Sequence, residues 1–155
     1  MAWPLQSKGM KTLDEFSQPS PSRTGAGISV LVVDDETAVR RFAARVLERE
    51  GIGVLEAIDG VEALDLFNNG NPPIIDLVLS DIVMPRLNGV ELMQALSVSH
   101  PEIPVILMSG YATAALAERG IATPCSIIPK PFPAERLLAE VRRCVGTRDG
   151  GSSAA

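Results

Sequence analysis

The chain has 155 residues, of which 46% are hydrophobic and only 4% aromatic, and its formal net charge is −5 at pH 7. This length and hydrophobic content suffice for one domain whose core is built mainly from aliphatic side chains. The negative net charge argues against a nucleic-acid-binding protein, which needs a basic face to replace the counterions of the phosphate backbone.

Residues 1–27 are rich in Ser and Pro and lack both helical periodicity and the continuous apolar run of a signal peptide. We expect a flexible leader at 1–27, one domain at 28–146 and a flexible tail at 147–155. No apolar run of about 18 residues is present, so no membrane span is expected. The two cysteines, Cys125 and Cys144, form no CxxC motif. This favours free thiols, rather than a disulfide or a metal site, in a soluble cytoplasmic protein.

Short apolar runs alternate with helical periodicity between these two segments. The expected strands cover 28–33, 53–57, 74–80, 104–108 and 126–128. Helices are expected around 39–47, 61–67, 90–97, 112–119 and 137–145. Strands that alternate with helices predict an α/β fold, a single doubly wound (βα)₅ domain with a parallel five-stranded sheet and helices on both faces.

Polar side chains follow the carboxyl ends of four of these strands. They are Asp34, Asp35 and Glu36 after the first strand, Asp81 after the third, Ser109 after the fourth and Lys130 after the fifth. Ligand sites of open parallel sheets lie at this edge, so these side chains are expected to meet there.

Three neighbouring carboxylates require positive charge, because two of them about 4 Å apart repel by roughly 4 kcal/mol at an effective dielectric constant near 20. Lys130 supplies one positive charge, and a Mg²⁺ ion would supply two more through oxygen ligands. We expect Asp35 and Asp81 to bind the ion directly, and Asp34 to bind it through water or to orient its ligands. The backbone carbonyl of Val83, in the sharp turn after Asp81, is the expected remaining donor.

A site of this kind suits a phosphoryl group. Asp81 is the expected nucleophile, since a carboxylate can form an aspartyl-phosphate. Lys130 is expected to pair with one phosphoryl oxygen, and the Ser109 hydroxyl to donate to another. Gly89, at the end of the turn, is expected to permit close packing of loop and helix or a positive φ.

Four motifs in this order resemble the receiver domains of bacterial two-component response regulators. They are VVDDE at 32–36, LSDIVMPRLNG at 79–89, MSGY at 108–111 and PKPF at 129–132. The resemblance implies a flavodoxin-like fold with strand order 2-1-3-4-5. It also implies Mg²⁺-dependent transfer of a phosphoryl group from a phosphohistidine to Asp81, followed by slow self-catalysed hydrolysis. The protein would then be a signalling switch rather than an enzyme.

The resemblance also implies partners. A histidine kinase or a histidine phosphotransfer protein would donate the phosphoryl group, and a downstream protein effector would read it. No nucleic-acid or membrane partner is expected, and the chain is expected to be a monomer or a weak phosphorylation-dependent dimer. It is expected to be a stand-alone receiver, a piece of a hybrid kinase or a fragment of a longer regulator.

One residue departs from the family pattern. The family usually has Phe or Tyr three residues before the lysine, where this chain has Ile127. Because Ile127 cannot swing a ring inward, the signal is expected to leave through the loop 109–111, with Tyr111 as the candidate. The weak helix that follows, at 112–123, is expected to be the most mobile ordered region.

Other interpretations stay open at this point. A haloacid-dehalogenase-like phosphatase also uses an aspartate at a strand end, but it needs a second acid where this chain has Val83. A flavodoxin-like cofactor binder would need a Ser/Thr/Gly-rich phosphate loop where Asp34–Glu36 stand. A receiver that no longer takes phosphate would serve only for docking. Away from the strand ends, Glu56, Asp59 and Asp76 are expected to be solvent-facing or loop charges, and His100 to have no catalytic role.

Overall fold

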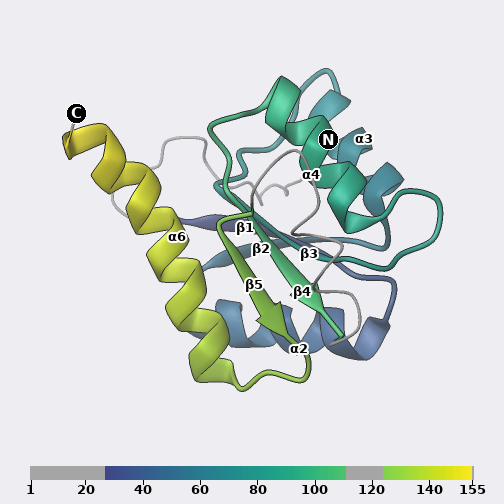
Figure 1. The fold of residues 1–155 in the computed structure, drawn as a ribbon, viewed down its shortest axis with the longest axis horizontal. Coiled ribbons are helices and arrows are strands. Elements are labelled where there is room, and N and C mark those ends of the chain that lie inside the picture. The colour runs from purple at the N-terminus through teal and green to yellow at the C-terminus, as the bar shows by residue number, and fades with distance from the viewer. Residues whose placement is uncertain (1–26, 111–123, 155) are drawn as a thin grey trace, which may run out of the picture.

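The computed structural model describes residues 27–110 and 124–154, so the leader, Tyr111 and the expected helix at 112–119 lie outside the described residues. Figure 1 shows the described elements around a central sheet. The strands are β1 (Ser29–Val33), β2 (Gly53–Ala57), β3 (Leu77–Asp81), β4 (Val105–Ser109) and β5 (Ser126–Pro129). The helices are α2 (Thr37–Arg49), α3 (Gly60–Asn68), α4 (Gly89–Ser99) and α6 (Ala134–Ala154).

The five strands form one parallel sheet in the order β2-β1-β3-β4-β5, which confirms the predicted fold class. The register aligns Asp81 with Met108 and Ser109 with Pro129, so the carboxyl ends of β3, β4 and β5 lie at the same edge. The functional residues expected at strand ends are therefore brought to one edge by the topology itself.

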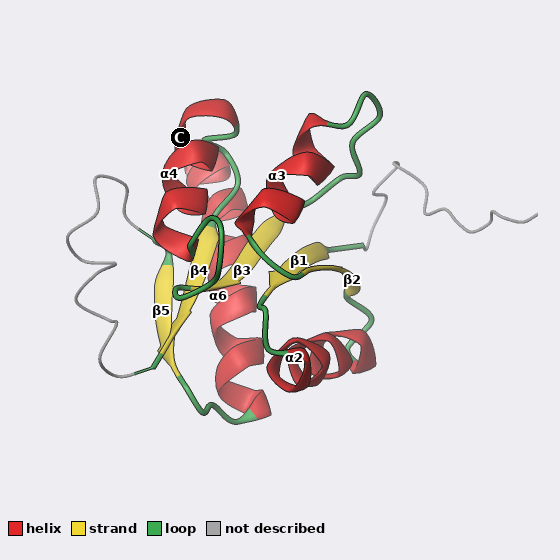
Figure 2. Ribbon diagram, turned by 90° about the vertical axis from the view of Figure 1, so that its right-hand side faces the viewer, coloured by secondary structure: helices red, strands yellow, loops and turns green. Residues whose placement is uncertain are grey.

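The core lies in two layers, one on each face of the sheet. Figure 2 shows α2 and α6 on one face and α3 and α4 on the other. Alternate residues of one strand point into different layers: Val30 and Val32 pack with α2 and α6, whereas Leu31 and Val33 pack with α3 and α4. Burial on both faces explains why β1 reads as a continuous apolar run.

Two acids expected to be solvent-facing or loop charges, Asp76 and Asp59, lie in loops but are buried. Asp76 accepts a hydrogen bond from the Ser29 N–H through Oδ2 at 2.8 Å, and its own N–H donates to the Ser29 carbonyl at 2.8 Å. This pairing attaches the chain to the start of β1, and β3 begins only at Leu77, after the expected residue 74. Asp59 is only 2% exposed and caps α3. Both acids are buried because backbone N–H groups satisfy their carboxylates.

The expectation of free thiols is wrong. Cys125, just before β5, and Cys144, on α6, form a disulfide with their Cα atoms 6.0 Å apart. Helix α6 packs against β5 in a way that sets the two side chains face to face, although they are 19 residues apart in the chain.

The last helix is longer than expected, since α6 continues to Ala154 and includes most of the segment that we predicted as a tail. Its apolar periodicity ends near Val145, which is why the sequence pattern did not indicate the extension. Among the described residues, no helix has the length and apolar character needed to cross a membrane.

Candidate functional site

Three carboxylates gather at the carboxyl edge of the sheet. Asp34 and Asp35 follow β1, and Asp81 ends β3, which pairs directly with β1. One carboxylate oxygen from each residue lies within 4.8 Å of the others. Asp34 and Asp81 are buried, whereas Asp35 is exposed at the mouth of the cluster.

Lys130 enters this cluster from the loop after β5. Its Nζ lies 3.0 Å from Asp81 Oδ1 and 3.1 Å from Asp34 Oδ2, and a longer contact of 3.9 Å reaches Glu36. The Lys130 N–H donates to the Ser109 carbonyl at 2.7 Å, which continues the β4–β5 pairing beyond Pro129. The sheet therefore fixes the backbone position from which the Lys130 side chain reaches the two carboxylates.

The electrostatics of the site reflect burial and crowding together. Burial raises the pKa of Asp81; the hydrogen bond from Lys130 acts in the opposite direction, and the charges of Asp34 and Asp35 raise the pKa further. Burial lowers the pKa of Lys130, but its interactions with Asp81 and Asp34 outweigh burial, so this pKa is raised and the side chain stays charged. The excess of negative charge thus remains, because one ammonium group faces three acids.

Asp34 has an oxygen that is unsatisfied by hydrogen bonds. Its Oδ1 accepts from the Glu36 N–H at 2.8 Å, and its own N–H donates to the Ala57 carbonyl at 3.1 Å. Its Oδ2 is buried and receives no hydrogen bond from the described residues; its contact is the Lys130 ammonium group. Buried polar oxygens normally have a partner.

An oxygen-rich cluster with this orphaned atom fits a hard divalent cation. Mg²⁺ binds through one or two carboxylates together with waters and phosphate oxygens. The expected ligands Asp34, Asp35 and Asp81 are brought together by the structure as such a set.

Ser109 ends β4 and is buried, next to Pro129 and one residue before Lys130 in register. It lies on the strand beside Asp81, whose partner in the pairing is Met108. The two residues expected to contact a phosphoryl group, Ser109 and Lys130, therefore flank the end of β3 on the same side.

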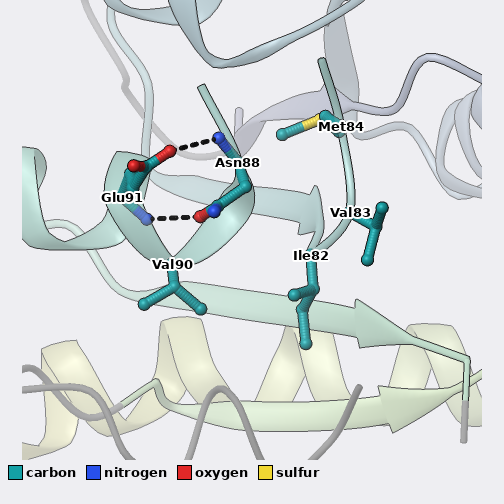
Figure 3. Close-up of a pocket in the computed structure, with 6 residues that line it drawn as sticks. All are labelled: Ile82, Val83, Met84, Asn88, Val90 and Glu91. Carbon is teal, nitrogen blue, oxygen red and sulfur yellow. Dashed lines mark hydrogen bonds between the residues drawn. The ribbon is translucent and has the colours of Figure 1, made fainter. Parts of the chain in front are cut away.

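The chain turns sharply after Asp81 because a glycine lets it return. The Gly89 N–H donates to the Ile82 carbonyl at 2.8 Å, and a Cβ at Gly89 would clash with the Asp81 carbonyl oxygen. Of the two expected roles of Gly89, close packing is the one observed. Helix α4 then starts with a capping box, in which Asn88 and Glu91 exchange hydrogen bonds of 2.8 and 2.9 Å (Figure 3).

A groove of about 390 Å³ lies beside this turn. Figure 3 shows Ile82, Val83 and Met84 along the chain leaving β3, with Asn88, Val90 and Glu91 as the other lining residues. Val83, whose carbonyl is the expected metal ligand, is 58% exposed through its side chain. The loop thus keeps Val83 at the surface, two residues after Asp81.

Sequence reasoning missed an ion pair next to this loop, between the exposed Arg86 and the buried Asp59. Arg86 donates to Asp59 twice, from Nε at 2.8 Å and from Nη2 at 3.2 Å. Asp59 also accepts from the Glu62 N–H at 2.9 Å as the N-cap of α3. An acid three residues before a glutamate resembles the capping-box signature and could have identified the cap, but nothing local indicates the partner 27 residues away.

Two other expectations concern residues away from the cluster. His100 is the C-cap of α4. Its ring packs against the ring of Phe67, and the two ring centroids are 4.8 Å apart. Ile127 is half-buried on β5 and packs against the layer formed by α3 and α4.

Comparison with known proteins gives a consistent result. The family model of the response regulator receiver domain matches residues 30–142. The sensor kinase CckA of Brucella abortus (strain 2308) is 38% identical over 122 residues, which make up 78% of this chain and 13% of the kinase. The response regulator MprA of Mycobacterium sp. (strain KMS) is 39% identical over 116 residues, 74% of this chain and 49% of the regulator. The chain therefore spans only part of the length of these relatives.

Solved structures resemble the whole described sheet. The receiver domain of NtrX from Brucella abortus is 36% identical with a TM-score of 0.69, over 76% of this chain and 98% of that one. A CheY-like receiver domain protein from Methanospirillum hungatei JF-1 is 26% identical with a TM-score of 0.72, over 81% of this chain and 99% of that one.

Proposed function

The chain belongs to the family of response regulator receiver domains, and we propose that it accepts a phosphoryl group on Asp81 in a Mg²⁺-dependent reaction that switches its binding to a protein partner. The observation that supports this most is the meeting of Asp34, Asp35, Asp81 and Lys130 at one edge of the sheet. Three neighbouring carboxylates repel one another, so such a cluster needs positive charge, which Lys130 supplies in part and a divalent cation would complete.

Metal binding would fall to Asp34, Asp35 and Asp81, with the Val83 carbonyl as a further donor. The ion would neutralise charge on both the carboxylates and the phosphoryl oxygens. Asp34 is held by the Ala57 carbonyl and the Glu36 N–H, so its Oδ2, which contacts Lys130 and accepts no hydrogen bond from the described residues, is positioned before any ion arrives. This preorganisation reduces the free-energy cost of assembling the ligands.

In the transfer step, a carboxylate oxygen of Asp81 attacks the phosphorus of a phosphohistidine. The new O–P bond forms as the N–P bond breaks, and the imidazole nitrogen of the donor keeps the electron pair. Lys130 already touches Asp81 at 3.0 Å, so it can pair with an oxygen of the transferred group. Ser109, at the end of the neighbouring strand, offers a hydroxyl donor to another oxygen.

The phosphoryl group adds about −1.5 to −2 units of charge to the site. It shifts a conformational equilibrium only if it stabilises two states unequally, and moving the populations from 1:99 to 99:1 takes about 5.5 kcal/mol. Lys130, from the loop after β5, and Ser109, at the end of β4, are the groups through which that difference would arise, since both would contact the phosphoryl oxygens. We propose that the signal leaves through Tyr111, two residues after Ser109.

We propose a histidine kinase or a histidine phosphotransfer protein as the donor, and a protein effector as the reader, in the cytoplasm. Similarity to one segment of a sensor kinase and to part of a response regulator supports both a hybrid-kinase and a regulator context. Comparing proteins captured by the phosphorylated and the unmodified chain would identify the effector.

The test is intact mass spectrometry after incubation with a small phosphodonor such as acetyl phosphate. We expect one phosphoryl group per chain with Mg²⁺, none with a chelator and none in Asp81→Asn. A folded wild-type chain that stays unmodified with Mg²⁺ would support the alternative, a receiver that serves only for docking.

A further inference from the structure

We propose that the ion pair between Asp59 and Arg86 is a positioning element of the phosphoryl-transfer site, which fixes the loop 82–88 so that the Val83 carbonyl can serve the metal. This inference rests on the proposed function. It assigns a role to two residues outside the acidic cluster.

The loop has a conformation that needs external support. Arg86 has a positive φ of 67°, and the Leu87 N–H donates to the Pro85 carbonyl at 2.7 Å, which closes a three-residue turn around Arg86. Turns of this kind with a positive central φ are rare and strained, and a non-glycine residue in such a region costs about 1–3 kcal/mol. The surroundings must therefore hold the turn in place.

Asp59, at the start of α3, supports the turn by binding the side chain of Arg86. Both of its oxygens receive hydrogen bonds from the guanidinium group of Arg86, the bidentate geometry in which arginine and carboxylate are most specific. Asp59 is buried and fixed as the N-cap of α3. The hydrogen bond from Arg86 lowers the pKa of Asp59, so the carboxylate stays ionised.

Two backbone contacts extend the same connection. The Gly60 N–H donates to the Leu87 carbonyl at 3.2 Å, and a Cβ at Gly60 would lie 2.7 Å from that oxygen. At the other end of the loop, the Gly89 N–H closes the neck on the Ile82 carbonyl. The loop is thus held at its neck by β3 and at its outer edge by the start of α3.

The turn between β2 and α3 also contacts the acidic cluster. Ala57, two residues before Asp59, accepts the hydrogen bond from the Asp34 N–H at 3.1 Å. One short segment therefore connects the chain carrying Asp34 with the loop carrying Val83. Loss of the ion pair would remove one of the two described links at the outer edge of the loop, leaving the Gly60–Leu87 hydrogen bond, and would leave the three carboxylates in place.

The test measures Mg²⁺ affinity by titration calorimetry in the wild type, Arg86→Ala and Arg86→Gly. Arg86→Gly removes the ion pair and also the cost of the positive φ, so a loss of Mg²⁺ affinity in this variant cannot come from backbone strain at position 86. We expect both variants to bind Mg²⁺ about 10-fold more weakly or worse, the effect usual for groups that orient metal ligands. At saturating Mg²⁺, phosphorylation of Asp81 by acetyl phosphate should return close to the wild-type rate.

The matched control is Arg142→Ala, which removes an arginine–carboxylate pair with Glu50 (2.7 Å). Glu50 follows α2 and precedes β2, so this pair lies at the amino edge of the sheet, and Mg²⁺ affinity should not change. Wild-type affinity in both Arg86 variants would overturn the inference alone. Absence of Mg²⁺ binding by the wild type would overturn the proposed function as well.

Discussion

Reduction of the disulfide between Cys125 and Cys144 should weaken the domain substantially. The bond closes a loop between residues 19 positions apart and attaches the start of β5 to α6. In the chain-entropy model, releasing a loop of this length from its cross-link costs about 3 kcal/mol of stability at 25 °C. That is a large share of the roughly 5–15 kcal/mol by which domains are stable.

The assay is urea unfolding with and without a phosphine reductant, with thiol titration to verify that the bond is open. Cys125→Ala is the control, because it cannot form the bond and its midpoint should be the same in both conditions. Cys144 is only 1% exposed, so replacing it would also leave a cavity and confuse the comparison. An unchanged wild-type midpoint after complete reduction would refute the reasoning.

Three further predictions concern the site and its loop. Asp81→Asn should raise the midpoint of denaturation at neutral pH without Mg²⁺, since burial and neighbouring acids raise the pKa of Asp81 and disfavour its charged form in the fold; a lower midpoint would contradict this. Gly89→Ala should cost about 1–3 kcal/mol or more by overpacking against the Asp81 carbonyl. Gly70→Ala is the control, because a Cβ at Gly70 would have no atom within 4 Å, and it should change stability little. Equal losses of stability in the two variants would argue against the close contact between Gly89 and the Asp81 carbonyl. Because Arg86 lowers the pKa of Asp59 below 3.8, the ion pair stabilises the fold above that pH and the effect fades as the pH falls through the folded-state pKa. The stability difference between wild type and Arg86→Ala should therefore be full at neutral pH and shrink below pH 3.8, and a difference independent of pH would contradict this.

The sequence predicted the fold and the acidic cluster because both follow from one pattern. A parallel sheet places all carboxyl ends of its strands at one edge, so residues that follow β1, β3 and β5 meet even though they are distant in the chain. The alternation of strands and helices alone therefore predicts that Asp34, Asp81 and Lys130 share one site. The match to known receiver motifs reinforced this assignment.

The features that sequence reasoning missed depend on contacts between elements. The pairing of Cys125 with Cys144 needs the packing of α6 on β5, and that of Asp59 with Arg86 needs two loops to meet. Neither has a periodic signal. The burial of Asp76 could not be predicted either, because a carboxylate that accepts a hydrogen bond from a distant backbone N–H group has no distinct local sequence pattern.

The account depends most directly on whether the acidic cluster takes up a divalent cation. Calorimetric titration of Mg²⁺ into the wild type and into Asp35→Asn tests this, because Asp35 is the exposed member whose removal leaves the buried ones intact. We predict one ion bound per chain in the wild type and a large loss of affinity in Asp35→Asn. Equal binding by the two proteins, or no binding by either, would contradict the central claim.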